Sequence, residues 1–454
     1  MAAPENQTSN LMNGAEALLR PTLDRGLGET LAIIADNDEI TYCQLAAAVN
    51  RCAHVFRDYG VEPQDRVLIF ADDSPEFFYA YLGAMKIGAV PVAINLRVSV
   101  DDFGFMIEDS GCKVVLVGAE FLPIVRQAEK NMKEFPPLIL MERQESGLAN
   151  LAELMVDKPD EIEPVLLAPD KSVLWLYTSG TTGHPKGVVH KLDLINSIHI
   201  YLADVYGLGP GDRIFCTSKL FFAFSVGHVL LGALRLGATA IIQSGWPSAE
   251  AIAAVVERHR PTHFLSVPTM YHNLLHQDYG KSEAFRSVRH FISAGEHLPK
   301  TLFHKWQAMS GQPILDAIGA SELVALFIGN RPDDYSPGST GKPMSATDIR
   351  LATESGETIE EDGIPCVVWV RSGTVAAGYW NQDEKTAAAF VDGWYCSGDF
   401  FVRDAEGRYY YQGRSDDMLK ISGQWVSPGE IEDYVLENER FRKSPSSATK
   451  TKKG

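Results

Sequence analysis

A short loop before the middle of the chain concentrates the groups that proteins use to hold phosphate. The stretch LYTSGTTGHPKGVVH (residues 176–190) carries glycines at 180, 183 and 187, four small hydroxyl side chains and Lys186. Glycine tolerates positive φ, so such a loop can turn several amide N–H groups toward one concave side and form an anion nest. The hydroxyl groups add hydrogen-bond donors, and Lys186 adds one mobile charge. We predict that this loop binds a phosphate chain.

The spacing within the loop excludes one common phosphate-binding motif and predicts a local fold. A Walker A loop needs GxxxxGK[ST], but the fifth residue after Gly180 is Pro185 instead of a second glycine. The apolar run 173–177 precedes the loop and the pair Val188 and Val189 follows it. This pattern predicts a strand, a loop and a second strand. A flexible surface turn rich in Gly, Ser and Thr is the alternative interpretation.

Three later motifs, taken with this loop, resemble one enzyme family. TSGTTGHPKG resembles the phosphate loop of the adenylate-forming superfamily, which includes acyl-CoA and aryl-CoA ligases, nonribosomal adenylation domains and beetle luciferases. DAIGASE (316–322), WYCSGD (394–399) and GRSDDMLKISG (413–423) follow in that family's order. They resemble its nucleotide-lining segment, its ribose-binding segment and its interdomain hinge. The resemblance spans residues 15–437 and is greatest to benzoate-CoA and other aryl-CoA ligases.

The resemblance implies a site for ATP and Mg²⁺, with roles that suit the side chains. It places the ribose on Asp399, whose carboxylate can accept hydrogen bonds from both hydroxyls. It places Mg²⁺ on Glu322, a hard oxygen ligand, and it directs the planar guanidinium of Arg414 to the ribose or a phosphate. Asp316 and Ile318 would form part of the adenine wall. The implied nucleotide-binding residues are Thr178, Ser179, Gly180, Thr181, Thr182, Gly183, Lys186, Gly295, Glu296, Asp316, Ile318, Ser321, Asp399 and Arg414.

The chemistry implied by these parts rests on positioning and charge. A carboxylate is a poor electrophile, and converting one of its oxygens to an AMP ester supplies a leaving group that a thiol can displace. No protein nucleophile is required, and the sequence contains no GxSxG, no HExxH and no GxGxxG after a strand. The implied cofactors are ATP, Mg²⁺ and coenzyme A. The implied catalytic residues are Thr178, Lys186, Glu322 and Lys420, with Mg²⁺ on Glu322 and the hinge at Asp416.

A pocket for the acid is implied by the segment KLFFAFSVGHVLLG (219–232), which resembles the substrate segment of aryl-CoA ligases. Amino-acid adenylation domains place an aspartate where this chain has Ala223, so a bound α-amino acid would leave its ammonium buried and unpaired. This favours a neutral aryl acid, benzoate-like before fatty. Phe224 and Ala325 stand where some benzoate-type relatives carry a tyrosine and a histidine, which leaves room for a ring substituent. His228 faces either the pocket or the core. Expected substrate contacts are Phe222, Ala223, Phe224, Gly227 and Ala325, with Phe221, Val226 and Phe327 also in the wall.

The elements that must position these residues alternate along the chain. β-branched runs such as 66–71 alternate with amphipathic stretches such as 74–88, which predicts βα units that build mostly parallel sheets. After residue 340, glycine-punctuated runs such as 365–373 predict a β-rich subdomain. We expect an α/β fold with a large N-terminal lobe of βα-built sheets, that β-rich subdomain, and only the start of a small mobile C-terminal α+β domain. Further expected elements are 90–95, 101–111, 113–118, 238–243, 249–260, 262–268, 288–293 and 407–413.

The expected domain boundaries follow from the resemblance. They are a flexible N-terminus (1–14), the AMP-binding adenylation domain (15–415), a C-terminal domain remnant (416–437) and a disordered basic tail (438–454). The family's late lysine, in a motif resembling PKTxxGK, has no counterpart in RKSPSSATKTKKG. Loss of one positioned cation costs about 2.7–4 kcal/mol, so we expect impaired adenylation and still weaker thioester formation. A naturally short protein, a frameshifted end and an incomplete chain are the alternatives for this end.

Together these inferences predict an ATP-dependent carboxylic acid-CoA ligase that acts on an aryl acid. Two alternatives stay open. The first is a medium-chain fatty acyl-CoA or acyl-AMP ligase that loads a carrier protein, and the second is a catalytically dead nucleotide-binding remnant. The resemblance to stand-alone ligases favours CoA over a carrier-protein thiol as the acceptor.

Composition limits the other classes of function. The chain has 454 residues, of which 45% are hydrophobic, enough for two or more lobes. The formal net charge of −18 argues against a nucleic-acid or anionic-membrane partner. Six scattered cysteines and an N-terminus without a basic n-region predict a reduced, cytoplasmic protein, and a homodimer stays open. The longest apolar run, 229–242, is too short to span a bilayer and predicts a buried helix followed by a strand.

Overall fold

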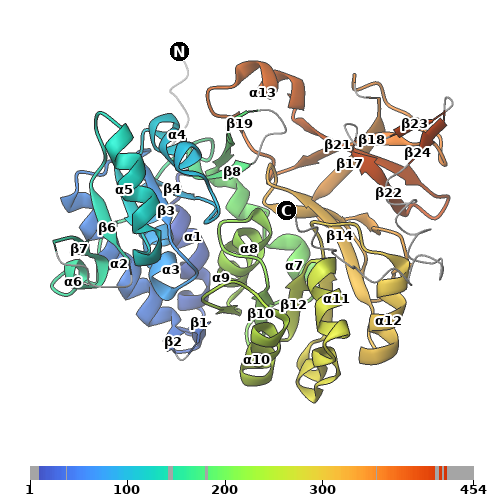
Figure 1. Cartoon of the computed structure of the whole chain (residues 1–454), viewed down its shortest axis with the longest axis horizontal. Helices are drawn as coiled ribbons and strands as arrows, with labels where there is room; N and C mark the ends of the chain where they lie inside the picture. The colour runs from blue at the N-terminus through green and yellow to red at the C-terminus, as the bar shows by residue number, and fades with distance from the viewer. Residues whose placement is uncertain are drawn as a thin grey trace, which may run out of the picture.

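The computed structural model of the chain describes residues 10–36, 38–141, 147–178, 183–353 and 355–414, together with the backbone of residues 419–421 and 424–426. The strands of the described residues form sheets of eight, nine and five strands, and a separate two-stranded pair lies near the end of the described chain. In Figure 1 the eight-stranded and nine-stranded sheets lie side by side, and the five-stranded sheet lies at the upper right. The predicted α/β fold class is confirmed.

The eight-stranded sheet contains the predicted phosphate-loop strands. Its order is β19-β9-β8-β4-β3-β5-β6-β7, and only β9 and β19 run antiparallel to their neighbours. β8 and β9 pair with Thr178 opposite Lys186, so the predicted strand, loop and strand are confirmed. The strands are β3 (Arg66–Phe70), β4 (Val90–Ala93), β5 (Val114–Val117), β6 (Leu138–Leu140), β7 (Ala149–Asn150), β8 (Ser172–Thr178), β9 (Lys186–Lys191) and β19 (Gly378–Tyr379).

The nine-stranded sheet supplies the strand that carries the DAIGASE motif. Its order is β16-β15-β14-β13-β12-β10-β11-β1-β2, with a parallel centre and antiparallel edges. The motif lies on β14 and runs into the turn before β15. The strands are β1 (Leu31–Ala35), β2 (Asp38–Thr41), β10 (Arg213–Cys216), β11 (Thr239–Ile242), β12 (His263–Ser266), β13 (His290–Ser293), β14 (Ile314–Ala320), β15 (Ala325–Gly329) and β16 (Lys342–Pro343).

The five-stranded sheet is the predicted β-rich subdomain. It is antiparallel, in the order β17-β18-β21-β20 with β22 on the other part of β21. The WYCSGD motif lies on β21, and Arg414 ends β22. The elements are β17 (Thr347–Ala352), β18 (Cys366–Ser372), α13 (Asp383–Ala389), β20 (Phe390–Val391), β21 (Trp394–Arg403) and β22 (Tyr409–Arg414), with the pair β23 (Leu419–Ile421) and β24 (Gln424–Val426) after them.

The helices begin and end where local chemistry favours it. Thr41 and Gln44 form a reciprocal capping box at the start of α2 (Tyr42–Asp58). Ser74 caps α3 (Pro75–Lys86), with Pro75 at the first helical position, and Gly111 ends α4 (Val100–Ser110) at φ +54°. The other α-helices are α1 (Gly14–Asp24), α5 (Leu122–Asn131), α6 (Leu151–Met155), α7 (Ile200–Asp204), α8 (Ala223–Ser225), α9 (Ala233–Leu236), α10 (Ala249–His259), α11 (Pro268–His276) and α12 (Lys300–Ser310).

The longest apolar run forms a wider helix than the sequence indicates. The structure places a π-helical segment, η4 (Val226–Gly232), between α8 and α9, and β11 follows. The predicted buried helix and strand are therefore both present, and every residue of η4 is buried. π-helical turns occur often at functional sites, and His228 of η4 lines one of the two cavities described below. In the part of the chain that the structure describes, no helix is both long and apolar enough to cross a membrane.

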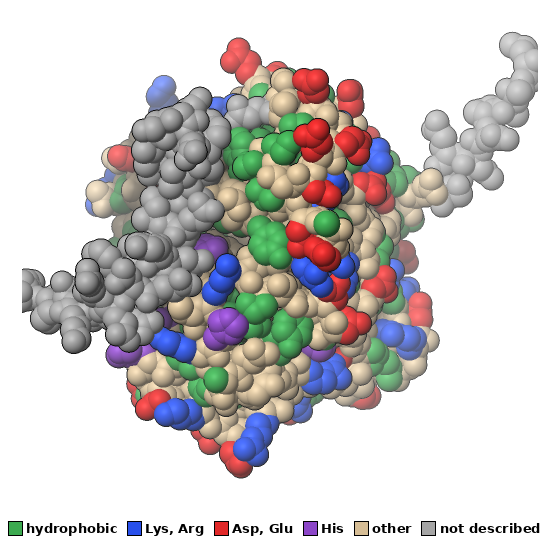
Figure 2. All heavy atoms as spheres, turned by 90° about the vertical axis from the view of Figure 1, so that its right-hand side faces the viewer, with side chains coloured by type: hydrophobic (Ala, Val, Ile, Leu, Met, Phe, Trp, Pro, Cys, Tyr) green, Lys and Arg blue, Asp and Glu red, His purple; other side chains and the backbone are tan. Residues whose placement is uncertain are grey.

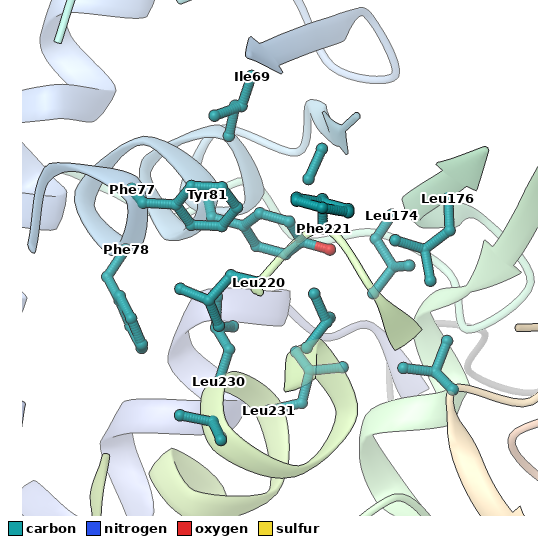
Figure 3. Close-up of a cluster of buried hydrophobic side chains, with 14 of the residues drawn as sticks. Ile69, Phe77, Phe78, Tyr81, Leu174, Leu176, Leu220, Phe221, Leu230 and Leu231 are labelled. Atoms are coloured by element: carbon teal, nitrogen blue, oxygen red, sulfur yellow. The ribbon is translucent and has the colours of Figure 1, made fainter. Parts of the chain in front are cut away.

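A buried apolar cluster joins the two large sheets. Figure 3 shows Phe77 and Tyr81 of α3 facing Leu174 and Leu176 of β8, with Leu230 of η4 below them. The rings of Phe77 and Tyr81 stack with centroids 5.9 Å apart. Each fully buried side chain of this size contributes about 1.5–3 kcal/mol. The cluster therefore fixes η4 relative to the phosphate-loop strands. Phe221, Val226 and Phe327, which were expected in the pocket wall, belong to this core instead.

Charges of both signs are spread over the surface. On the face shown in Figure 2, acidic and basic side chains alternate over the described residues, with acidic groups denser toward the top. The described residues on this face therefore carry both signs of charge instead of a single one.

Candidate active site

A cleft of about 830 Å³ lies where the three sheets meet, and the predicted nucleotide-binding residues gather in its walls. They come from the ends of β8 and β14, the start of β9, the turn after β13, and the paired strands β21 and β22. Parallel strands of neighbouring units place such residues at one edge of a sheet, where ligands of open α/β folds bind. The predicted residues that line the cleft are Thr178, Lys186, Gly295, Glu296, Asp316, Ile318, Ser321, Glu322, Asp399 and Arg414.

Some predicted residues have another position or lie outside the described chain. Gly183 has φ +101°, a conformation that favours glycine, but it does not line the cleft. Ser179, Gly180, Thr181 and Thr182 of the loop, the hinge residue Asp416 and the side chain of Lys420 lie outside the described residues.

Lys186 occupies the first position of β9, opposite Thr178 on β8. Its Nζ lies 4.5 Å from the ring centroid of Tyr379. Burial lowers the pKa of Lys186, while the nearby Glu322 opposes that shift. A partly desolvated ammonium with few other partners suits a polyanionic phosphate chain.

Glu322 is almost fully buried, with 9% of its surface exposed, and two tyrosines hold it. The hydroxyl of Tyr379 donates a hydrogen bond to Glu322 Oε1 at 2.7 Å, and the hydroxyl of Tyr395 also bonds this carboxylate. Burial and the neighbouring carboxylate raise the pKa of Tyr379 far above its usual value, so its hydroxyl keeps its proton. Neither tyrosine was assigned to the site from the sequence. The only local signal for them is their place in short aromatic runs, Gly-Tyr-Trp at β19 and Trp-Tyr at β21.

Hydrogen bonds to two backbone carbonyl oxygens hold the turn that carries Glu322. His190 on β9 is fully buried, and burial lowers its pKa to about 4, so its ring is neutral. Its Nε2 donates to the carbonyl oxygen of Ser321 at 2.9 Å. The Ala376 amide donates to the carbonyl oxygen of Glu322 at 2.8 Å. The eight-stranded sheet and the β-rich subdomain thus both fix the segment between β14 and β15.

Asp399 and Arg414 face each other across β21 and β22. Arg414 Nε lies 3.7 Å from Asp399 Oδ1, and the Asp399 amide donates to Ser397 Oγ at 3.1 Å. Burial raises the pKa of Asp399 to about 6, while Arg414 opposes this shift. The carboxylate is therefore charged at neutral pH, ready to accept hydrogen bonds from two neighbouring hydroxyls.

Asp316 lies deeper in the same cleft, at the end of the parallel part of the sheet. Its Oδ1 is buried and has no hydrogen-bond partner among the described residues. Burial raises the pKa of Asp316 well above its usual value. A buried oxygen without a partner is costly, and an exocyclic amino group of a purine would satisfy it. Ile318 lines the same wall and offers an apolar face to a ring.

The donor set also fits a magnesium ion bound together with phosphates. Among the described residues no group of three His, Cys, Asp or Glu side chains could hold a metal ion alone. Mg²⁺ usually binds through one or two carboxylates and takes its other ligands from water and substrate phosphates. Glu322, oriented by two hydroxyls and facing the cleft, meets that need.

A second cavity of about 490 Å³ adjoins the cleft and is mainly apolar. The predicted substrate residues Phe222, Ala223, Phe224 and Ala325 line it, together with Val324 and Leu326. Gly227 does not line the cavity but packs behind Val324. The two cavities share five lining residues, namely Gly295, Glu296, Gly319, Ala320 and Ser321.

His228 was expected to face either the pocket or the core, and it does both. It lines the acid pocket, and each of its ring nitrogens has a hydrogen-bond partner. The Tyr201 hydroxyl donates to its Nε2 at 2.6 Å, and its Nδ1 donates to the Phe224 carbonyl oxygen at 2.6 Å. Burial lowers the pKa of His228 to about 4, which keeps the ring neutral. The acidic residue among those that line the pocket, Glu296, already accepts hydrogen bonds from Thr269. Thr269 thus holds one oxygen of the carboxylate that lines this pocket, Oε2 of Glu296.

The mouth of the acid pocket carries two exposed aromatic side chains. Phe222 and Trp246 are 46% and 45% exposed, respectively, and both line the cavity. The guanidinium carbon of Arg97 lies 3.9 Å from the Trp246 ring centroid. Lys219 also lines the cavity but is buried, with its Nζ 2.7 Å from Asp72 Oδ1. An aromatic face with an arginine beside it suits a ligand that combines a ring with phosphate.

Comparison with known proteins agrees with this geometry. The model of the AMP-binding enzyme family matches residues 24–380. The chain is 44% identical to the 3-hydroxybenzoate-CoA ligase of Aromatoleum sp. (strain CIB), over 94% of this chain and 81% of that one. It is 38% identical to the benzoate-CoA ligase of Thauera aromatica, again over 94% and 81%. The crystal structure of the anthranilate CoA ligase AuaEII with anthranoyl-AMP superposes with a TM-score of 0.90 at 31% identity, covering 96% of this chain and 84% of that one. The resemblance found from the motifs is thus confirmed, and the chain belongs to the AMP-binding enzyme family.

Proposed function

We propose that this protein is an ATP-dependent aryl acid-CoA ligase. The observation that carries the proposal is the junction of the two cavities, which share the segments 295–296 and 319–321. A nucleotide in the polar cleft and an acid in the apolar pocket would bring an α-phosphate and a carboxylate together at this junction. Such positioning replaces a protein nucleophile.

The described residues then have distinct tasks in the first half-reaction. Asp399 accepts the ribose hydroxyls, and Asp316 and Ile318 hold the adenine ring. Thr178 and Lys186 lie on the phosphate side, where the ammonium stabilises negative charge as pyrophosphate leaves. A Mg²⁺ ion held by Glu322 would neutralise part of the triphosphate charge. The remaining loop residues, Ser179 to Thr182, together with Lys420 and the hinge at Asp416, belong to the same proposal.

The acid is proposed to be a neutral benzoate-type compound. The small side chains of Ala223 and Ala325 line the pocket together with Phe224, and position 223, where amino-acid adenylation domains carry an aspartate, is uncharged here. Two of the relatives are ligases of 3-hydroxybenzoate and of benzoate, which supports the same class. A hydroxybenzoate fits best, since the two alanines leave room for a substituent.

The acceptor is proposed to be the thiol of CoA. The mouth of the acid pocket opens beside the Arg97 and Trp246 pair, which suits the nucleotide end of CoA. A carrier protein would instead need an extended protein-protein surface around that mouth. An aryl acid is favoured over a fatty acid because the more similar relatives are ligases of 3-hydroxybenzoate and benzoate.

Pyrophosphate release with a panel of acids tests the proposal. The panel contains benzoate, 3-hydroxybenzoate, 4-hydroxybenzoate, octanoate and phenylalanine, each assayed with ATP and Mg²⁺, with and without CoA. We expect release with the benzoates and a thioester product only when CoA is present. Release with octanoate alone would indicate a fatty acyl ligase. ATP binding without release from any acid would favour a nucleotide-binding protein without activity.

A further inference from the structure

Tyr379 touches two groups of the proposed nucleotide site at once, through two different parts of its side chain. Its hydroxyl donates to Glu322 Oε1 at 2.7 Å, and its ring centroid lies 4.5 Å from Lys186 Nζ. Tyr379 also lines the cleft itself, although 91% of its surface is covered by protein, since it is 9% exposed.

The strand pairing explains why one side chain reaches both groups. β19 pairs antiparallel with β9, with Tyr379 directly opposite Val188. Directly paired residues share a face of the sheet, and so do residues two apart on one strand. Lys186 stands two residues before Val188, so Tyr379 and Lys186 project to the same side. Glu322, on the turn after β14, approaches that side from the neighbouring sheet.

The backbone around Tyr379 is held firmly. Its amide donates to Thr386 Oγ1 of α13 at 2.9 Å, and the Thr386 hydroxyl donates back to the Tyr379 carbonyl oxygen at 3.3 Å. Gly378 has φ +147°, and an added Cβ there would lie 2.4 Å from Thr386 Cγ2. The Tyr379 ring packs edge-on against Phe390 with centroids 5.5 Å apart. A side chain fixed in this way can fix the groups that it contacts.

We propose that Tyr379 is a positioning residue that sets Glu322 and Lys186 in their working geometry before ATP binds. The hydroxyl orients the Glu322 carboxylate so that its remaining lone pairs face the cleft, where a metal ion would be shared with the phosphates. The ring holds the Lys186 ammonium by a cation–π contact while the phosphates are absent. This proposal rests on the proposed function of the same cleft.

Two substitutions separate the two contacts. Tyr379→Phe removes the hydroxyl and keeps the ring, so it breaks the hydroxyl contacts with Glu322 and Tyr395 and keeps the contact with Lys186. Tyr379→Leu removes the ring contact as well. Tyr395→Phe is the comparison variant, because it removes the other hydroxyl on Glu322 and keeps both the Tyr379 ring and the bond from Tyr379 to Glu322.

Equilibrium binding of ATP is measured by calorimetry, once with Mg²⁺ and once with excess chelator. The metal-free affinity reports on the contact with Lys186, and the gain in affinity with Mg²⁺ reports on the contact with Glu322. For Tyr379→Phe we expect metal-free affinity within about twofold of wild type. The strengthening that Mg²⁺ gives should fall about tenfold, as is typical when a partner of a metal ligand is lost. Tyr379→Leu should show the same loss and, in addition, metal-free binding weakened about threefold to tenfold. Tyr395→Phe should reduce only the magnesium effect.

A double-mutant cycle and a stability measurement complete the test. In a Glu322→Gln background, Tyr379→Phe should change the magnesium effect no further. Thermal melts without ligand show whether each variant is folded, and Tyr379→Phe alone tests the hydroxyl if Tyr379→Leu does not fold. Wild-type binding with an unchanged magnesium effect in Tyr379→Phe would overturn this proposal alone. Failure of the wild type to bind ATP would overturn the proposed function with it.

Discussion

The carbonyl oxygen of Val324 packs against the Cα of Gly227 and fills the space that a Cβ atom would need. A Cβ built on Gly227 would lie 1.9 Å from that oxygen and 3.1 Å from Val324 Cγ1. Val324 itself has φ +58°, a conformation that β-branched residues rarely adopt. Strain of this kind persists only where the surroundings impose it, and it gathers at functional sites. This contact joins η4 to the turn that carries Glu322, and Val324 lines the acid pocket.

Gly227→Ala should therefore damage the pocket and the fold together. Because the obstructing atom is backbone, it cannot move aside as a long side chain would. We expect a loss of about 1–3 kcal/mol in the free energy of unfolding, measured by urea denaturation. The value of kcat/KM should fall for every acid in the panel. Gly104→Ala on α4 is the control, since its added Cβ meets nothing within 4 Å. It should gain about 1 kcal/mol from helix propensity, and equal stability of both variants would contradict the contact.

Val324→Ala should change which acids are accepted. Removing two methyl groups from the wall of the pocket opens space for larger rings or for substituents. We expect the ratio of kcat/KM for 2-naphthoate to that for benzoate to rise about tenfold. Val226→Ala is the matched control, because Val226 is equally buried but does not line the pocket. It should lose about 2 kcal/mol of stability with no change in that ratio. A similar ratio in both variants would place the determinant elsewhere.

The motifs predicted that Lys186, Asp316, Glu322, Asp399 and Arg414 would share one site, and all five line the same cleft. Their resemblance to the motifs of one family made that grouping possible, and their roles toward a nucleotide stay a prediction. Alternation of apolar runs predicted the sheets, since a period of two or of 3.6 residues is set by the backbone. The tertiary contacts that join these pieces have no such local signal.

The features that the sequence did not predict all depend on tertiary contacts. Tyr379 and Tyr395 reach Glu322 only because β19 and β21 lie on different sheets that converge at the cleft. Val226 is the first residue of the π-helical segment η4 and Phe221 precedes α8, and both lie in the core, which the apolar character of the segment alone could not distinguish from a pocket wall. The positive φ of Val324 runs against the preference of its own side chain, so no propensity argument predicts it.

Asp399 should make ATP binding and stability depend on pH in opposite directions. Burial raises its pKa from 3.8 to about 6. A carboxyl whose pKa is raised on folding favours the folded state below pH 4, and that contribution is lost as the pH rises through 6. Wild-type stability should therefore fall by about 1–3 kcal/mol relative to Asp399→Asn between pH 4 and pH 6, and the difference should stay constant above that.

Binding should follow the charged form of the same group. ATP affinity of the wild type should weaken as the pH falls below about 6, because a protonated carboxyl accepts fewer hydrogen bonds from the ribose. Asp399→Asn should bind ATP more weakly at pH 8 and lose this part of the pH dependence. Fluorescence titration with ATP from pH 5 to 8, alongside denaturation at each pH, checks both trends. An Asp399→Asn variant that is less stable than wild type at pH 8 would contradict the assignment.

Trp246 should affect the step that uses CoA more than the step that uses the acid. It lines the acid pocket but is 45% exposed, with Arg97 over its ring, and it does not line the nucleotide cleft. Trp246→Ala removes a face on which the nucleotide end of CoA can stack, so the KM for CoA should rise about tenfold. Acid-dependent exchange of pyrophosphate into ATP should stay within twofold of wild type.

Two comparisons make this test specific. Pantetheine has the thiol arm of CoA but no nucleotide, so its KM should be the same for wild type and Trp246→Ala. Val391→Ala removes another exposed apolar side chain, 40% exposed, which lines neither cavity, and should leave every parameter unchanged. An equal loss with pantetheine would mean that Trp246 acts on the thiol channel itself. An unchanged KM for CoA would move the nucleotide of CoA away from this mouth and favour a carrier-protein thiol as the acceptor.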